Sequence, residues 1–546
     1  MVRRGRSANM IVLVVVSALM TVLVSPLVQA QSEDEGRPLF FGMREIDFSA
    51  YEIAFAALTD DDVVRLEGLV LEKSIPEVAA AMQDGTLTSY ELTLFFLHRI
   101  QMYDIDQLNS IVDLNPGALD VARALDQERA EGTIRGPLHG IPVVLKDNIS
   151  TSSYLYTSAG AAALANALAD RDAFLVSQLR DAGAIVLAKT NMTEWANWMH
   201  YTPANGFSAV GGQTISPYAD WLDPSGSSTG AVVAVTGNFA SLAIGTETIG
   251  SIISPASRAS VVGFKPSLGL ISRDMVIPIT DEFDTPGPIG KSVEDVAIAM
   301  TVLASSRDET DVLSTEASSL TTLDFTEFLS PGSLEGKRIG VVASDPLQSD
   351  EYQFDIYALW QDVSLFESLG AEVVVIRPPE FPEYAWGTLF SCDLREEVDK
   401  YLRKTRSDFS SLAEIAQFNE ENPEYIPYGQ ERLHEAAACP LSSEEISLLG
   451  QQQRTAAAEY MAALFADLDV DLLLTIDEVF ALQYALAGNP AISVPRGLSD
   501  SGVPLGLTLI APYLKDRELL GYAYAFEQAL PQRAPPALVQ QSIDTE

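Results

Sequence analysis

The side chains best suited to chemistry in this sequence are one lysine and a small set of serines. Lys146 follows the apolar run Ile141–Leu145. A short apolar run of this kind is typical of a buried strand. A lysine at the end of a strand usually reaches solvent, but burial would lower the pKa of its amine by up to ~3–5 units. The sequence therefore predicts that Lys146 can act as a base near neutral pH.

Ser227 and Ser228 stand together in the segment Asp223-Pro-Ser-Gly-Ser-Ser-Thr-Gly230. One interpretation is a serine N-cap at the start of a helix. The segment also matches the G-x-S-x-G elbow of α/β-hydrolases, which would make Ser228 the nucleophile of an esterase. An elbow requires a buried strand directly before it, whereas residues 218–225 are polar and turn-like, and only His434 follows as a partner histidine. The pattern therefore favours the helix start.

Ser251 follows Gly250 in a third segment, which begins as a short apolar strand at Ala243 and continues to Ala256. A glycine in a tight turn after a strand leaves backbone N–H groups free to point at an oxyanion. On its own, however, a Gly-Ser turn does not identify Ser251 as a nucleophile.

Taken in order, these three segments resemble the amidase signature family. The marks of that family are a lysine in a G-I-P-x-x-x-K-D-N context, a G-S-S-x-G serine pair and a G-T-x-x-x-G-S nucleophile turn. The likeness spans residues 69–530 and is most similar to the bacterial peptide amidase branch. The other segments that carry it are Ala188–Asn197, Gly263–Gly269, Asp284–Pro288, Asn489–Pro495 and Pro504–Ile510.

The resemblance implies an α/β fold: a single domain with a mixed central β-sheet covered by helices. It also implies a hydrolase that cleaves carboxylic or peptide C-terminal amide bonds through an acyl-enzyme on Ser251. Ser227, held through a cis peptide, would relay a proton between Ser251 and neutral Lys146. No metal and no organic cofactor is implied, and the partner would be a small-molecule or peptide amide.

The resemblance further implies how the turn around the nucleophile is used. Backbone amides of Ile249, Gly250 and Ser251 would form the oxyanion hole, with Thr248 flanking it. Ser228 would orient the pair formed by Lys146 and Ser227.

The sequence departs from the family pattern near each of these segments. Ile249 stands where the peptide amidase branch carries Asp, and Ser225 and Thr229 stand where the serine pair is usually flanked by glycine. The stretch 472–487 is short and lacks the proline-containing landmarks that line the acyl pocket in relatives. We therefore expect the triad to be kept and the substrate pocket to be changed.

Alternating apolar patterns predict helices layered over a largely parallel sheet. Thr88 and Ser89 are expected to cap a helix that runs to Ile100. The other predicted segments are strands at 141–145, 184–188, 338–343 and 372–376, and helices at 172–182 and 354–369. The segments most like linkers are 308–331 and the tail after Pro531.

The whole chain divides into four predicted regions. Residues 1–30 are expected to be a signal peptide, with three arginines, the uncharged run Met10–Val24 and small residues up to Ala30. An uncleaved signal anchor is the alternative. An N-terminal extension (31–66), the amidase domain (67–531) and a C-terminal tail (532–546) follow. The protein is thus expected to be secreted or periplasmic, without stable membrane insertion after the signal is removed.

Composition limits the remaining partners. The formal net charge of −42 makes nucleic acid an unfavourable partner. Four scattered histidines and two cysteines show no spacing typical of a zinc site. Cys392 and Cys439 could form a disulfide or remain two free, buried thiols.

Two other functions remain open. One is a catalytically silent amidase fold that only binds, and the other is the transamidating subunit that matures aminoacyl-tRNA. The oligomeric state is left open.

Overall fold

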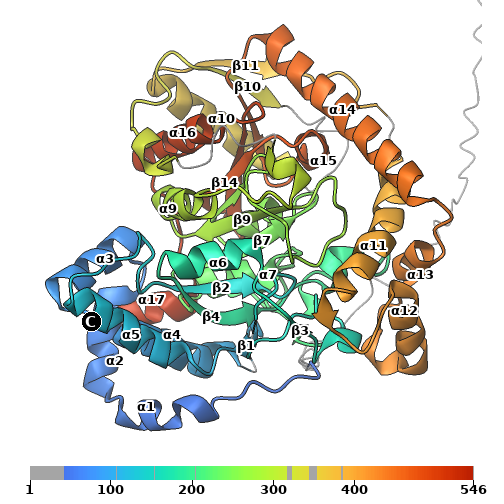
Figure 1. The fold of residues 1–546 in the computed structure, drawn as a ribbon. Helices are drawn as coiled ribbons and strands as arrows, with labels where there is room; N and C mark the ends of the chain where they lie inside the picture. Colours follow the sequence, from blue (N-terminus) through green and yellow to red (C-terminus); the bar gives the residue numbers. More distant parts are fainter. Residues whose placement is uncertain are drawn as a thin grey trace, which may run out of the picture. The chain divides into compact units, whose positions relative to one another are not determined.

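An eleven-stranded sheet runs through the computed structural model, which describes residues 42–544 except 106, 153, 203, 316–322, 343–352 and 383–384. Its strand order is β1-β4-β2-β7-β9-β8-β14-β15-β13-β10-β11 (Figure 1). These strands are β1 (Ile111–Leu114), β2 (Pro142–Lys146), β4 (Ile185–Thr190), β7 (Leu242–Glu247), β8 (Val262–Lys265), β9 (Thr285–Gly290), β10 (Arg338–Val342), β11 (Glu372–Ile376), β13 (Leu472–Ile476), β14 (Ala491–Leu498) and β15 (Pro504–Ile510). Two small two-stranded sheets pair β3 (Leu168–Ala169) with β12 (Thr405–Arg406), and β5 (Phe207–Ser208) with β6 (Gly212–Gln213).

The sheet is mixed, as the family resemblance implied, so the largely parallel sheet predicted from the apolar patterns is wrong. β2 lies parallel to both β4 and β7, and β10 lies parallel to β11 and β13. Antiparallel pairs join β7 to β9, β14 to β8 and β13 to β15. All residues of β2, β4 and β7 are buried, as expected for strands covered on both faces.

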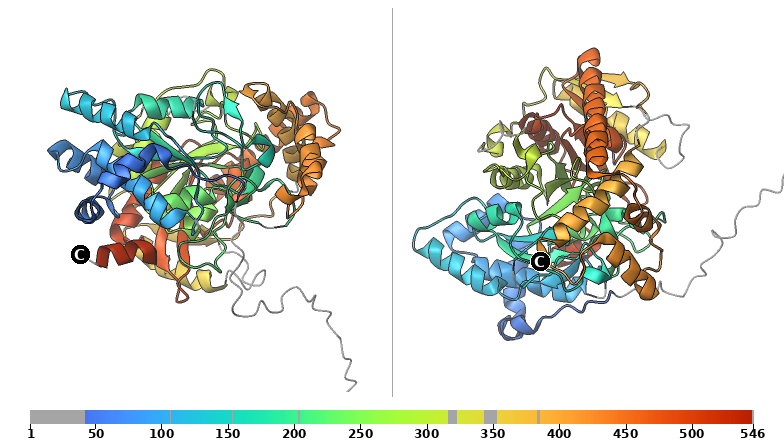
Figure 2. Two further views of the ribbon diagram at one scale, coloured as in Figure 1. Left: turned by 90° about the horizontal axis from the view of Figure 1, so that it is seen from below. Right: turned by 45° about the vertical axis from the view of Figure 1, so that its right-hand side comes forward.

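Helices cover this sheet and form two further groups (Figures 1 and 2). Helices α1 to α5 gather beside β1 and β4, and helices α11 to α13 form a separate cluster. The helices are α1 (Glu52–Ala57), α2 (Asp60–Val70), α3 (Ile75–Asp84), α4 (Ser89–Arg99), α5 (Ala118–Ala130), α6 (Phe174–Asp181), α7 (Thr229–Thr236), α8 (Ile253–Arg258), α9 (Val293–Leu303), α10 (Gln353–Ser368), α11 (Trp386–Leu402), α12 (Leu412–Glu421), α13 (Glu431–Ala437), α14 (Ser443–Leu468), α15 (Ala481–Leu486), α16 (Asp516–Ala529) and α17 (Ala537–Asp544).

The expected elements are found close to their predicted bounds. Thr88 caps α4, accepting the Glu91 N–H while the Glu91 carboxylate accepts the Thr88 N–H. The strands predicted at 141–145, 184–188, 338–343 and 372–376 are β2, β4, β10 and β11. The helices predicted at 172–182 and 354–369 are α6 and α10.

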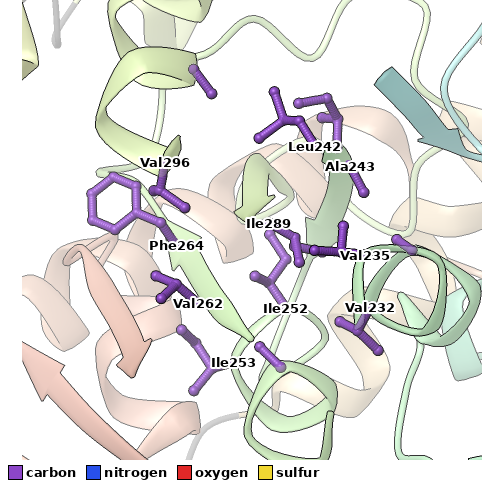
Figure 3. Packing of buried hydrophobic residues seen from close by; sticks show 14 of the residues in the cluster. Val232, Val235, Leu242, Ala243, Ile252, Ile253, Val262, Phe264, Ile289 and Val296 are labelled. Carbon is purple, nitrogen blue, oxygen red and sulfur yellow. The ribbon is translucent and has the colours of Figure 1, made fainter. Parts of the chain in front are cut away.

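Apolar packing fixes the strand that leads to the predicted nucleophile (Figure 3). Val232 and Val235 of α7 lie on one side of β7, near its buried residues Leu242 and Ala243. Ile252, at the start of α8, is buried in the same core. Side chains in such a core are close-packed, so the loops that join α7, β7 and α8 are held on a rigid base.

Both ends of the described chain pack onto the domain. Tyr51, in the part of the predicted extension that the structure describes, is buried and donates a hydrogen bond to the carbonyl of Asn115. In the tail, Arg533 pairs with Glu72 at 2.7 Å and donates to the carbonyl of Ser260. Val539 of α17 is fully buried. The tail is therefore a docked segment, although its composition resembled that of a linker.

Two remaining expectations concern the cysteines and the N-terminus. Cys392 of α11 and Cys439, just after α13, form a disulfide with their Cα atoms 5.2 Å apart. The predicted signal peptide lies outside the described residues. Within the part of the chain that is described, no helix has the length and apolar character needed to cross a bilayer.

Candidate active site

Lys146 is the last residue of β2, and its amine lies at the centre of a buried polar cluster. Its Nζ is 2.7 Å from the Ser227 Oγ and 3.0 Å from the Ser228 Oγ. It also donates to the carbonyl of Thr246 at 3.1 Å. Because β2 and β7 are parallel neighbours, their carboxyl ends place Lys146 and Thr246 together. The structure thus joins the lysine to both predicted serines.

Burial changes the acid–base character of this lysine. Lys146 has no exposed surface. Desolvation lowers its pKa to about 7, although the nearby carboxyls of Asp284 and Glu247 act in the opposite direction. Near neutral pH a large fraction of the amine is therefore uncharged, with a lone pair free to accept a proton.

Ser227 and Ser228 lie in a turn that precedes α7, with Ser228 at the N-cap. The peptide bond between Gly226 and Ser227 is cis, as the family resemblance implied. A Cβ on Gly226 would lie 2.3 Å from the Thr193 Oγ1, so this turn admits only glycine there. The residues before it form no strand, which removes the context that an α/β-hydrolase elbow needs at Ser228.

Ser228 links the other members of the cluster. Its hydroxyl donates to the Thr246 carbonyl at 3.0 Å and accepts from the Thr246 N–H at 3.3 Å. Its backbone N–H donates to the carbonyl of Ser251 at 3.2 Å, which places the predicted nucleophile beside the serine pair. Ser228 is therefore a supporting residue whose hydroxyl is already fully used.

Ser251 lies between β7 and α8 in a turn that exposes backbone donors. Gly250 has φ +73°, in the left-handed region that favours glycine. Among the described residues, the backbone N–H groups of Ile249, Gly250 and Ser251 have no main-chain acceptor. Unpaired donors side by side at a serine form the geometry of an oxyanion hole. Ser251 itself is largely buried, with 7% of its surface exposed.

Two buried acids hold this turn, and neither was singled out for this role in the sequence. One carboxylate oxygen of Glu247 accepts the N–H groups of Ile252 and Ile253, at 2.8 and 3.0 Å. Its other oxygen accepts the hydroxyl of Tyr484 at 2.9 Å. On the other side of the turn, the Thr248 hydroxyl donates to Asp284. Glu247 belongs to the same segment as Ser251, but Tyr484 and Asp284 lie far along the chain from their partners, so no local spacing indicated those two contacts.

A second buried lysine lies near Lys146. Lys189 of β4 has no exposed surface, and its Nζ is 3.6 Å from the Asp147 carboxylate. It donates to the Tyr156 carbonyl at 3.1 Å and the Thr157 hydroxyl at 2.9 Å. Desolvation lowers its pKa to about 8. Its pairing with a carboxylate gives Lys189 a structural role, in contrast to Lys146, whose direct partners are neutral.

The residues that depart from the family pattern contact one another or the core. The Thr229 hydroxyl donates to the Ser225 carbonyl at 2.6 Å, across the glycine of the cis peptide. Ile249 is partly buried and packs against the hydrophobic core. The changes near the serines are thus accommodated, and Ile249 places an apolar side chain beside the turn that carries Ser251.

A cavity of about 360 Å³ borders the cluster on the side of Thr246. Asp284 and Thr285 form part of its wall, together with Tyr401 of α11. In the described part of the chain no group of three or more His, Cys, Asp or Glu side chains could hold a metal ion.

The family model for amidases matches residues 91–476, which include every member of the cluster. The chain belongs to the amidase family. It is an amide hydrolase by this membership. A probable amidase of Arabidopsis thaliana is 32% identical over 86% of this chain and 92% of its own length.

Two further relatives place this amidase within the family. The solved peptide amidase of Stenotrophomonas maltophilia is 37% identical, covers 85% of this chain and 98% of its own, and superposes with a TM-score of 0.81. A glutamyl-tRNA(Gln) amidotransferase subunit of Acidothermus cellulolyticus is 32% identical over 87% of this chain and 98% of its own length. The amidase signature fold inferred from the sequence is thereby confirmed.

Proposed function

We propose that this amidase cleaves its substrate through an acyl-enzyme on Ser251, with Ser227 as proton carrier and neutral Lys146 as base. The observation that supports the proposal most directly is the 2.7 Å contact between the Lys146 amine and the Ser227 hydroxyl. A serine is a weak nucleophile until a base lies within reach, and Lys146 with a pKa lowered to about 7 can be that base.

The proposed reaction uses these groups in turn. The Ser251 Oγ attacks the amide carbonyl while its proton passes to the Ser227 Oγ, and the Ser227 proton passes to the Lys146 Nζ. The amides of Ile249, Gly250 and Ser251 donate to the oxyanion. The ammonium of Lys146 then returns a proton through Ser227 to the leaving amine as the C–N bond breaks. Water repeats the sequence on the ester and releases the acid.

The triad is tested by substitution and by an active-site label. Because the three side chains act as one relay, Ser251→Ala, Ser227→Ala and Lys146→Ala should each lower kcat by roughly 10³-fold or more, and double variants should lose little more. A fluorophosphonate probe should label the wild type and should not label Ser251→Ala. Near-normal turnover in Ser251→Ala, with a large loss in Ser228→Ala, would assign the nucleophile to Ser228 instead. If the wild-type protein is not labelled by the probe and does not hydrolyse an amide, the result would instead support a catalytically silent binding protein.

For the substrate we propose a primary amide at a peptide C-terminus, or a similar small acyl amide, which releases ammonia. The similarity to the Stenotrophomonas peptide amidase supports this choice. The similarity to an amidotransferase subunit supports the alternative of a transamidating enzyme. The net charge of −42 disfavours tRNA as a partner. A binding assay with crude tRNA separates the two, since a transamidating enzyme should bind and a peptide amidase should not.

Export is the last part of the proposal. The basic start and the uncharged run Met10–Val24 support a signal peptide that is cleaved after Ala30, which makes the protein secreted or periplasmic. Intact mass after expression in a host with a general secretory pathway should show Gln31 as the N-terminus. A membrane-bound product that begins at Met1 would show an uncleaved anchor instead.

A further inference from the structure

Glu478 lies against the oxyanion turn, although it comes from a distant part of the chain. It follows β13 and precedes α15, in the stretch that is shorter than expected for the family. A Cβ built on Gly250 would lie 2.9 Å from the Glu478 Oε2, so the carboxyl occupies the space directly beside this glycine. The side chain is exposed to solvent, yet desolvation raises the pKa of its carboxyl.

Two hydroxyls connect Glu478 to the serine-pair turn. The Ser254 hydroxyl is close enough to the Glu478 carboxyl to oppose the rise in its pKa. The Ser254 Oγ is in turn 2.8 Å from the Ser225 Oγ. Ser254 belongs to α8 directly after the nucleophile, and Ser225 precedes the cis peptide. The chain Ser225–Ser254–Glu478 therefore touches both turns that carry the predicted triad serines.

The backbone of Ser225 is constrained at the serine-pair end of these contacts. Ser225 has φ +60°, a conformation that is costly for a residue other than glycine. Its carbonyl accepts the Thr229 hydroxyl at 2.6 Å, and its N–H donates to Asp223 at 2.7 Å. The side chain, the carbonyl and the N–H of Ser225 therefore each have a hydrogen-bond partner. A glycine here would lack the side-chain contact and would have more conformational freedom.

We propose that Ser225, Ser254 and Glu478 form a positioning network that sets the distance between the oxyanion turn and the serine pair. The inference rests on the proposed function, because it concerns the geometry of the same triad. None of the three side chains touches the reacting atoms. Their loss should therefore lower kcat, which depends on the placement of the oxyanion donors, and leave KM nearly unchanged.

The test compares Glu478→Ala, Glu478→Gln and Ser254→Ala by amide turnover and by the rate of fluorophosphonate labelling. Glu478→Ala and Ser254→Ala should each lower kcat and the labelling rate about tenfold, with KM changed less than twofold. Glu478→Gln keeps an acceptor for the Ser254 hydroxyl and should retain at least a third of the wild-type rate. The double variant Ser254→Ala/Glu478→Ala should be no slower than either single variant, because one contact is being removed twice.

A matched control is available in the turn between β14 and β15, where the Ser499 and Ser501 hydroxyls are 2.9 Å apart and exposed. Ser501→Ala removes an equivalent contact far from the triad and should leave both rates unchanged. If Ser254→Ala does not fold, Ser225→Ala takes its place, because it removes the same contact between the two hydroxyls from the other side.

The proposal is overturned if Glu478→Gln lowers kcat as much as Glu478→Ala. It is also overturned if the losses in Ser254→Ala and Glu478→Ala add in the double variant, or if KM changes instead of kcat. A wild type that labels, together with variants that label equally fast, overturns the network alone. A wild type that neither labels nor hydrolyses an amide overturns the proposed function as well.

Discussion

In the proposed mechanism, the pKa of Lys146 is the property of a single residue that most directly governs the reaction. Burial lowers this pKa to about 7, so the amine is protonated below that pH and neutral above it. If neutral Lys146 is the base, kcat/KM should be low in acid, rise through about pH 7 and stay high into alkaline conditions. The measurement is a pH–rate profile between pH 5 and 10.

Histidine substitutions supply the control for this profile. None of the histidines belongs to the catalytic cluster, so replacing each one singly should leave the rising limb in place. The four positions are His98, His139, His200 and His434. If the rising part of the pH–rate profile shifted in one of these histidine variants, the base would be an imidazole.

Ile249 is the residue expected to set the choice of acyl group. It is partly buried, packs on the core and replaces a polar residue beside the oxyanion turn. We expect the wild type to favour apolar acyl groups, and Ile249→Asp to improve a C-terminally amidated dipeptide relative to a fatty amide, an aryl amide and the matching ester. The measurement is kcat/KM for all four substrates. Equal losses on all four would mean that Ile249 serves only the packing of the turn.

At the scale of elements, Glu247 and Tyr484 connect the nucleophile turn to α15. Tyr484→Phe removes the hydroxyl that donates to the buried Glu247 carboxylate at 2.9 Å. A buried acceptor that loses a donor costs about 1–3 kcal/mol, so the unfolding transition in urea should shift by that amount. We also expect kcat to fall, because the other Glu247 oxygen holds the N–H groups at the start of α8.

Tyr201 offers a matched control for that substitution. Its hydroxyl donates to Glu435 at 2.6 Å at an exposed site. Water can replace this contact, and Tyr201→Phe should change the free energy of unfolding by less than about 0.5 kcal/mol. Equal effects of the two substitutions would show that the Tyr484 contact does not support the turn.

At the scale of the whole molecule, the net charge of −42 should act on substrates before they bind. A surface of one sign attracts opposite charges over a distance set by the Debye length, which falls from about 10 Å at 0.1 M salt to about 3 Å at 1 M. A cationic dipeptide amide should therefore have a higher kcat/KM than an anionic one at low salt, and the ratio should fall severalfold by 1 M. A ratio that does not change with salt would place the selectivity in the pocket itself.

The sequence alone determined the parts of this protein that depend on local order. Lys146, Ser227 and Ser251 each lie in a short segment with its own signals, such as an apolar strand, a helix cap or a glycine turn, and the structure brings Lys146 to Ser227 and Ser228 to Ser251. The bounds of β2, β10 and α10 were also predictable, because apolar periodicity is a property of neighbouring residues. The same periodicity wrongly predicted a largely parallel sheet, and only the family resemblance implied the mixed one.

Tertiary structure decided the contacts between residues that are distant in the chain. Glu247 with Tyr484, and Gly250 with Glu478, are separated by more than two hundred residues, and no local pattern relates them. Composition allowed Cys392 and Cys439 to be paired or free, and only the packing of α11 beside α13 brings them together. The pKa of Lys146 belongs to this group as well, since it depends on how completely the assembled fold excludes water from the amine.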